Sequence, residues 1–294
     1  MTSEAGGQPA GSSVLDKLVE RWPLLLGLAI LCIPPLVELG RQAWTRENGV
    51  HGPLILATWI WLLWRGVEEA RGEARPGRLL PAMIALVPAL TLFIGAWAFD
   101  FISLVIVALV TVIIAMVYLE LGPAISKQIW FPLVYGYFLV PPPGYAIDTL
   151  TLPLKSAISQ FVSQALANLG YPIIQSGVSL YIAQYQLLVE DACSGLSSMF
   201  SLLALGLFYV YLMHRSNWRY ALVLALFIIP AAILANLIRV LAIVLITYYF
   251  GNEIAQGIIH DTTGMLVFIV TLLSVFLIDK LLTPVRLRLE EKRA

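Results

Sequence analysis

The chain has 294 residues, of which 60% are hydrophobic and 12% are charged, and its mean hydropathy is +0.86. These values lie well outside the range of soluble domains and indicate a polytopic membrane protein. Lys plus Arg and Asp plus Glu each total 18 residues, so the overall charge implies no attraction to nucleic acid. The two cysteines, Cys32 and Cys193, lie far apart in the sequence, which argues against a disulfide framework.

The order of polar and apolar segments predicts a short tail followed by membrane-spanning helices. Residues 1–21 are polar and rich in Gly and Ser, so we expect a disordered tail, and we expect residues 22–294 to form a single integral-membrane domain. The first apolar run is longer than a signal-peptide core and has no clear cleavage site, so it is predicted to be a span. A hydrocarbon layer of about 30 Å needs roughly 17 to 25 apolar residues. The predicted spans are the eight segments 22–39, 51–64, 79–97, 101–119, 124–140, 192–213, 220–247 and 262–281.

Two of these spans leave the count open between seven and nine. The second is short, and the seventh is long enough to tilt strongly or to break near Pro230. The basic residues test the eight-span arrangement, because Lys and Arg concentrate on the cytoplasmic side of bacterial membrane proteins. With a cytoplasmic N-terminus, fourteen Lys and Arg residues fall inside, and only four fall outside: Arg41, Arg46, Lys155 and Arg239. The bias supports eight spans with both termini in the cytoplasm.

The longest segment outside the predicted spans, residues 141–191, is expected to form an extracytoplasmic insertion of a helix and strands. After a Pro-rich turn, apolar residues recur at helical spacing opposite Lys155, Ser159, Ser163 and Gln164; these are Leu150, Leu154, Ile158, Phe161, Ala165 and Leu169. Alternation after Gly177 predicts one or two short strands. We expect this insertion to face the substrate, with the helix either in the membrane interface or packed over the active site. An exposed strand edge would pair with an extended peptide, and the alternative is a lid without specificity.

Cys193 has an environment that suits a nucleophile. Asp191 is placed to cap the sixth span, which puts Cys193 in the first helical turn, where unpaired amides and the helix dipole favour a thiolate. The carboxylates of Glu190 and Asp191 oppose this effect. A neighbouring cation must therefore offset them, and the outer-side candidates are Arg239 and His260.

Arg239 and His260 are predicted to reach the same side of the membrane as Cys193. Arg239 lies twenty residues beyond Arg219, or about 30 Å along a helix, and His260 just precedes the eighth span. An intramembrane guanidinium usually faces the protein interior, where it would stabilise a thiolate and an oxyanion. The alternative is an interfacial Arg that reaches the lipid headgroups or pairs with an acidic residue. For His260 the choice is between proton transfer to a leaving amine and a polar residue at a helix boundary.

Other kinds of site have less support in the sequence. Ser194, Ser197 and Ser198 lack the final Gly of a nucleophile elbow and are better explained as small residues for helix packing. The sequence has no His-Glu-x-x-His motif, no paired cysteines and no phosphate-binding loop. We therefore expect neither a metal nor a cofactor.

Taken together, these motifs resemble the exosortase and archaeosortase family. The resemblance is carried by Ala192-Cys193-Ser194-Gly195, Asn236-Leu237-Ile238-Arg239 and His260 followed by Gly264. It extends over most of the chain through His51-Gly52, Pro141 to Pro143 and Leu169-Gly170-Tyr171-Pro172.

The resemblance implies a membrane-embedded cysteine transpeptidase with Cys193 as nucleophile, His260 as acid and base, and Arg239 as the oxyanion or thiolate partner. Similar enzymes process exported proteins that carry a C-terminal sorting signal of the PEP-CTERM type, namely a short Pro-Glu-Pro-type motif, a transmembrane helix and a basic tail. Bacterial members act in the inner membrane, often beside exopolysaccharide genes, so the active site is expected to face the periplasm.

The mechanism expected from both arguments is attack by Cys193 on a substrate peptide bond, followed by transfer of the acyl group from a thioester to an acceptor. Two alternatives stay open. A hydrolytic membrane protease would use the same residues with water as acceptor, and a transport or export component would need no nucleophile. Apart from Arg239, the predicted spans have few interior charges, which weighs against transport. The sequence leaves the acceptor, the sorting motif and the oligomeric state undetermined.

Overall fold

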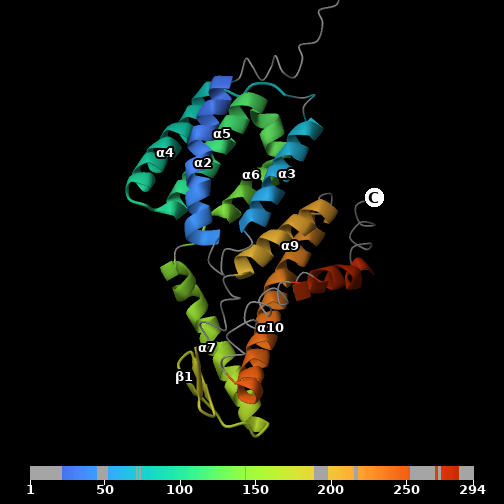
Figure 1. The fold of residues 1–294 in the computed structure, drawn as a ribbon. Coiled ribbons are helices and arrows are strands. Elements are labelled where there is room, and N and C mark those ends of the chain that lie inside the picture. Colours follow the sequence, from blue (N-terminus) through green and yellow to red (C-terminus); the bar gives the residue numbers. More distant parts are fainter. Residues whose placement is uncertain are drawn as a thin grey trace, which may run out of the picture.

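The computed structural model describes residues 22–44, 52–70, 72, 74–142, 144–188, 198–214, 218–251, 269–270 and 273–284. The predicted tail, residues 1–21, lies outside the described residues. The described chain is mostly helical and forms two groups of elements, which Figure 1 shows one below the other.

The upper group, called the bundle here, contains most of the apolar helices (Figure 1). Its elements are α2 (Trp22–Leu39) with a π-helical extension η1 (Gly40–Trp44), α3 (Gly52–Ala70), α4 (Leu79–Ala98), α5 (Ile102–Gln128), α6 (Trp130–Tyr135), the 3-10 helix η4 (Gly136–Leu139) and α9 (Ser198–His214). The lower group, called the distal part, contains α7 (Gly144–Asn168), the strands β1 (Ile173–Ser176), β2 (Ser179–Ile182) and β3 (Tyr185–Leu188), and the C-terminal half of α10 (Trp218–Phe250). The N-terminal half of α10 packs on α9, so this one helix belongs to both groups.

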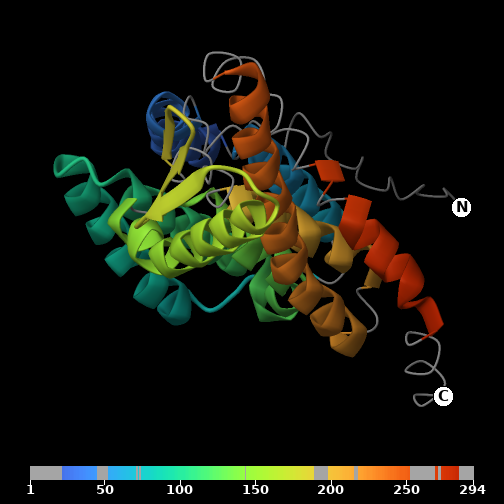
Figure 2. The same cartoon turned by 90° about the horizontal axis from the view of Figure 1, so that it is seen from below.

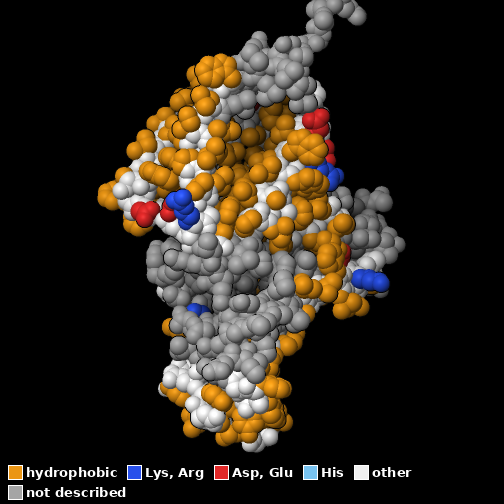
Figure 3. All heavy atoms as spheres, viewed as in Figure 1, with side chains coloured by type: hydrophobic (Ala, Val, Ile, Leu, Met, Phe, Trp, Pro, Cys, Tyr) orange, Lys and Arg blue, Asp and Glu red, His pale blue; other side chains and the backbone are white. Residues whose placement is uncertain are grey.

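Four described helices are long and apolar enough to cross a membrane. They are Leu26–Trp44, Leu79–Ala98, Ile102–Gln128 and Leu222–Phe250, and Leu203–Met213 is a shorter apolar helix. Figure 3 shows hydrophobic side chains over most of the visible face of the bundle, as a lipid-facing surface requires. The prediction of a mostly helical polytopic membrane protein is confirmed, and the count of eight spans stays a prediction.

The predicted fifth span, residues 124–140, is not a single helix. α5 continues to Gln128 but is kinked at Gly122, whose φ of 83° is left-handed. The residues after Gln128 form the separate elements α6 and η4. The segment before α4 explains the kink. The Gly77 N–H donates to the Leu119 carbonyl at 2.9 Å, and the Arg75 N–H donates to the Leu121 carbonyl at 3.3 Å. These contacts satisfy carbonyls that the helix leaves open where Pro123 has no N–H to donate.

The seventh predicted span is one continuous helix. α10 runs from Trp218 to Phe250 without a break at Pro230, so the predicted alternative of a break there is wrong. At 1.5 Å per residue, the 33 residues of α10 extend over about 50 Å.

The bundle core combines apolar packing with specific polar contacts between helices. The Trp59 indole N–H of α3 donates to the Pro132 carbonyl of α6 at 2.9 Å. Thr58 hydrogen-bonds the Tyr135 hydroxyl at 3.1 Å, and the rings of Phe131 and Tyr211 stack with centroids 4.2 Å apart. Helices in lipid associate largely through such close packing and interhelical hydrogen bonds.

A carboxylate ties the C-terminal helical residues 273–281 to α9 and α10. Asp279 accepts hydrogen bonds from the Tyr209 hydroxyl at 2.5 Å and from the Tyr220 hydroxyl at 2.6 Å. Tyr220 and Val275 also belong to the apolar cluster at this end of α10. Charge-assisted hydrogen bonds of this kind are roughly twice as strong as neutral ones, so Asp279 fixes the N-terminal half of α10.

The distal core is formed by aliphatic side chains from three directions. Ile158, Val162 and Leu166 of α7 pack with the inward residues of the sheet and with the C-terminal half of α10. The inward sheet residues are Ile173, Leu180, Ile182 and Leu187, and those of α10 are Val240, Ile243 and Val244. Figure 2 shows α7 and α10 crossing beside the sheet when the molecule is seen from below.

The sheet has three antiparallel strands in the order β1-β2-β3; β2 and β3 follow Gly177, where one or two strands were predicted, and β1 before it was not predicted. Ser176 pairs with Ser179 and Ile182 pairs with Tyr185, so each hairpin has a two-residue loop. Gly177 (φ 62°) and Ala183 (φ 50°) begin these loops. Positive φ is what short hairpin turns require, so Gly177 is a turn residue and the first strand precedes it.

Candidate active site

Arg239 is the one predicted catalytic residue that the structure describes. Its side chain is 4% exposed and lies on the face of α10 that also carries Asn236, which is 1% exposed. Val240, the next residue, belongs to the distal core, while Ile228, three turns earlier, belongs to the cluster with α9. Arg239 therefore lies where α10 passes from the bundle into the distal part.

The burial of Arg239 favours an interior guanidinium over one that reaches the lipid headgroups, since a headgroup-facing side chain would be exposed. Burying a charged side chain is unfavourable unless other groups compensate it. Both Arg239 and Asn236 have interaction partners. The geometry is thus that of a cation held inside the protein on a rigid helix, which is the arrangement an oxyanion-stabilising residue needs.

A second row of buried polar side chains lies on α7. Thr151, Lys155 and Ser159 are 8%, 7% and 0% exposed and are spaced four residues apart, so they share one face of the helix. The Ser159 hydroxyl donates to the Lys155 carbonyl at 2.8 Å. Phe161 and Leu169, in contrast, are 55% and 74% exposed.

The predicted division of this helix into an apolar face and a polar face holds only in part. Ile158 of the apolar set is buried, but Phe161 of the same set is exposed, and Lys155 and Ser159 of the polar set are buried. Helical periodicity identifies two faces but does not say which of them meets the protein. In the structure, part of the polar face turns inward with Ile158, Val162 and Leu166.

Cys193 and His260 lie outside the described residues, so their relation to Arg239 stays a prediction. The described elements that flank them are β3, which ends at Leu188, and α10, which ends at Phe250. Leu187 packs in the same cluster as Val240. A Cβ on Gly251 would lie 3.4 Å from the Tyr185 hydroxyl, so the end of α10 and the start of β3 are close neighbours. The segment that contains Cys193 and the segment that contains His260 thus both depart from the distal part.

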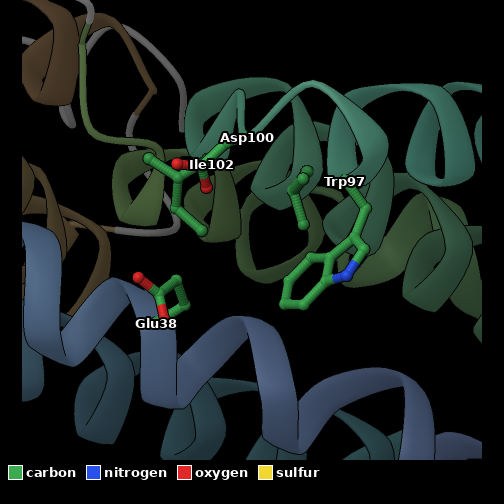
Figure 4. Close-up of a pocket in the computed structure, with 5 residues that line it drawn as sticks. Glu38, Trp97, Asp100 and Ile102 are labelled. Carbon is green, nitrogen blue, oxygen red and sulfur yellow. The ribbon is translucent and has the colours of Figure 1, made fainter.

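A separate cavity of about 370 Å³ lies at the end of the bundle and was not anticipated from the sequence. It is lined by Glu38, Trp97, Asp100, Ile102 and Val105. Figure 4 shows Glu38 on α2 across from Trp97 and Asp100 at the end of α4. The Gln42 amide donates to Glu38 at 2.8 Å and to Asp100 at 3.4 Å, which links the two carboxylates. The sequence gives no sign that Glu38 and Asp100 are neighbours, because 61 residues lie between them.

Among the described residues, no three His, Cys, Asp or Glu side chains are grouped so as to hold a metal ion. Arg65 and Glu69 form an ion pair at 2.8 Å on the exposed side of α3.

The fold is that of a helical integral membrane protein, with the buried Arg239 where α10 passes from the bundle into the distal part. The family described as transmembrane exosortase (Exosortase_EpsH) matches residues 44–277. Because this match covers most of the chain, the protein belongs to the transmembrane exosortase family, as the sequence motifs indicated. No curated protein and no solved structure matches the chain.

Proposed function

We propose that the protein is a membrane cysteine transpeptidase that removes a C-terminal sorting signal of the PEP-CTERM type from exported proteins. The reaction takes place at the outer face of the bacterial inner membrane, with both termini of the enzyme in the cytoplasm. Membership of the exosortase family supports this function. The observation that carries it is the burial of Arg239 on an apolar helix, at a position that matches the family motif.

The first half of the reaction forms a thioester. The Cys193 thiolate adds to the carbonyl carbon of the scissile peptide bond, and the negative charge that develops on the carbonyl oxygen is stabilised by the Arg239 guanidinium. His260 donates a proton to the departing nitrogen as the C–N bond breaks. The sorting signal leaves as a free amine, and the substrate stays attached to Cys193.

The second half of the reaction restores the enzyme. An acceptor nucleophile gives its proton to His260 and attacks the thioester carbonyl, and the C–S bond breaks to regenerate the thiolate. An amine-bearing lipid or a glycan gives a conjugated product, whereas water gives a free C-terminus. The mass of the product C-terminus therefore distinguishes transfer from hydrolysis.

The test is coexpression with a protein that carries a Pro-Glu-Pro C-terminal signal, followed by measurement of the rate of processing. Cys193→Ala is expected to abolish processing, and Cys32→Ala, the matched control on α2, to leave it unchanged. Arg239→Ala is expected to reduce the rate by about 10²- to 10³-fold, as the loss of an oxyanion donor does. Arg65→Ala, which removes an exposed Arg on α3, serves as its control.

A thioester intermediate gives a direct readout of the chemistry. Hydroxylamine added to the unmodified enzyme and its substrate should attack the thioester and release the substrate as a hydroxamate, and Cys193→Ala should yield no hydroxamate. Processing that continues in Cys193→Ala at the rate of the unmodified enzyme contradicts the proposal.

A further inference from the structure

We propose that the distal part lies at the depth of the outer lipid headgroups and the adjoining acyl chains, where its surface contacts lipid and not water. The sequence alone suggested an extracytoplasmic domain for most of this region. The side of the membrane follows from the orientation in the proposed function, but the depth does not depend on any catalytic role.

The first argument is the absence of charge. No Asp, Glu, Lys, Arg or His occurs in the sequence from Ser156 to Val189, or along α10 from Val240 to its end at Phe250. These two stretches include the whole sheet, about half of α7 and the last third of α10. Water-exposed protein surfaces normally carry charged residues at about 25–35% of positions. A surface of this size without charge is suited to contact with lipid.

The second argument is the direction in which α7 turns its side chains. Leu152 and Phe161 are 54% and 55% exposed, and Leu169 directly after the helix is 74% exposed, while Lys155 and Ser159 are buried. A helix in water buries its large apolar residues and exposes its charge. α7 does the reverse for its one described cation, as helices do when they meet lipid on their outer side.

The third argument is the length of α10. Its apolar portion, Leu222–Phe250, has 29 residues and therefore extends over about 43 Å. A bilayer measures about 40–45 Å when both headgroup layers are included. An apolar helix of this length reaches from one headgroup layer to the other, which places its C-terminal end, and the elements packed on it, at the outer headgroups.

The fourth argument is a group of tyrosines at that end. The ring of Tyr171 meets Tyr248 at 5.2 Å and Tyr249 at 6.3 Å between centroids, and the hydroxyls of Tyr171 and Tyr249 lie 2.8 Å apart. Tyr249 and Phe250 are 63% and 65% exposed. Tyr residues with an apolar ring and a polar tip are typical of the membrane–water interface.

Lipid fits these observations better than a protein partner does. The exposed apolar residues come from α7, from β1 and from the end of α10, so they lie on different elements of the distal part. The charge-free stretches 156–189 and 240–250 include parts of all three elements, whereas a protein interface normally has a rim of polar and charged groups around its apolar centre. The same apolar helix that crosses the bundle continues into the distal part, so the lipid-facing surface is continuous.

The experiment measures the depth of a nitroxide on the full chain in vesicles of phosphatidylethanolamine and phosphatidylglycerol. The label is attached to Ile174→Cys, at a position that is 71% exposed on β1, in a background of Cys32→Ala and Cys193→Ala. Collisions with oxygen, which concentrates in lipid, are compared with collisions with a water-soluble nickel chelate by electron paramagnetic resonance. We expect oxygen collisions to exceed nickel collisions several-fold at residue 174.

Two matched positions calibrate the measurement. Ala74→Cys, in the exposed basic loop before α4, should favour nickel, and Ile84→Cys, 66% exposed on α4, should favour oxygen more strongly than residue 174 does. Leu169→Cys provides a second distal site if Ile174→Cys fails to fold. Nickel accessibility at residues 169 and 174 equal to that of Ala74→Cys overturns the proposal in favour of water. Protection from both reagents overturns it in favour of a protein partner or a second copy of the chain. Neither outcome bears on whether Cys193 is the nucleophile.

Discussion

The bundle and the distal part are held together in different ways. In the bundle, aromatic side chains form specific hydrogen bonds between elements. Trp59 bonds the Pro132 carbonyl, and Tyr137 bonds the Thr111 hydroxyl at 2.9 Å. In the distal part, the buried cluster is aliphatic, and its tyrosines lie at the edge. The difference shows that geometry is specified in the bundle by individual polar contacts and in the distal part by the filling of space. Arg239 is placed by a helix that takes part in both.

The largest effect is expected for Gly122→Ala in the bundle. A Cβ at this position would lie 2.0 Å from the Arg75 carbonyl oxygen, and φ is +83°. Left-handed strain and overlap together should lower the free energy of unfolding by about 4 kcal/mol. Thermal unfolding in detergent measures the loss.

Two other glycines sharpen this test. At Gly170 in the distal part, φ is +87° but a Cβ would have no neighbouring atoms. Gly170→Ala should therefore lower the free energy of unfolding by about 1–2 kcal/mol. Gly95→Ala has open space and a helical backbone, so it should be neutral or slightly stabilising. Equal losses at residues 122 and 170 would show that the close contact with Arg75 is unimportant.

The next largest effect is expected for Leu180→Ala, which removes a side chain with 0% exposure from the centre of the distal core. The cavity should lower the free energy of unfolding by about 3 kcal/mol. Ile174→Ala, on the outer face of the sheet, should change it by less than about 1 kcal/mol. If both substitutions have the same small effect, the distal part is not held by the packing of its core.

A smaller effect is expected for Trp59→Phe in the bundle. The substitution leaves the buried Pro132 carbonyl without its indole donor and shortens a ring that packs against Gly136, so about 2 kcal/mol should be lost. Trp64→Phe, at a site that is 65% exposed, is the control and should have little effect on the midpoint of thermal unfolding. A loss no greater than that of the control would show that directed contacts are not what holds the bundle.

The smallest effect is expected for Tyr171→Phe at the edge of the distal part. The lost hydroxyl contact with Tyr249 is exposed and should be worth about 0.5 kcal/mol. Tyr181→Phe, at a hydroxyl for which no hydrogen bond is described, should leave stability unchanged. If Tyr171→Phe lowers the free energy of unfolding by more than about 2 kcal/mol, polar contacts stabilise the distal part as strongly as they stabilise the bundle.

Long and uniformly apolar helices were the elements that sequence reasoning predicted best. α2 has the predicted bounds, and α4 ends one residue later than predicted, because each follows a run of apolar residues bounded by a polar segment. The kink at Gly122 lies in the predicted gap between the spans 101–119 and 124–140, but its hydrogen bonds to residues 75 and 77, which are remote in the sequence, were not predicted. The two faces of α7 were predicted only in part, because the sequence pattern does not reveal which neighbours bury Lys155 and Ser159 and leave Phe161 exposed.

For the candidate site, the sequence left open whether Arg239 faces the interior or reaches the lipid headgroups, and its burial favours the interior. The meeting of Arg239 with Cys193 and His260 stays a prediction. The link between Asp279 and two tyrosines, and the cavity between Glu38 and Asp100, were missed, since each joins residues from separate helices whose packing no short motif encodes.

Because α10 is one continuous helix, it moves as a rigid rod when its tilt changes. A change in tilt of about 5° moves the far end of a rod of about 50 Å by about 4 Å. Bilayers of different thickness impose different tilts on a helix of fixed apolar length. A thinner or thicker membrane would therefore displace the distal part relative to the bundle. The rate of the proposed reaction would then vary with the acyl-chain length of the surrounding lipids.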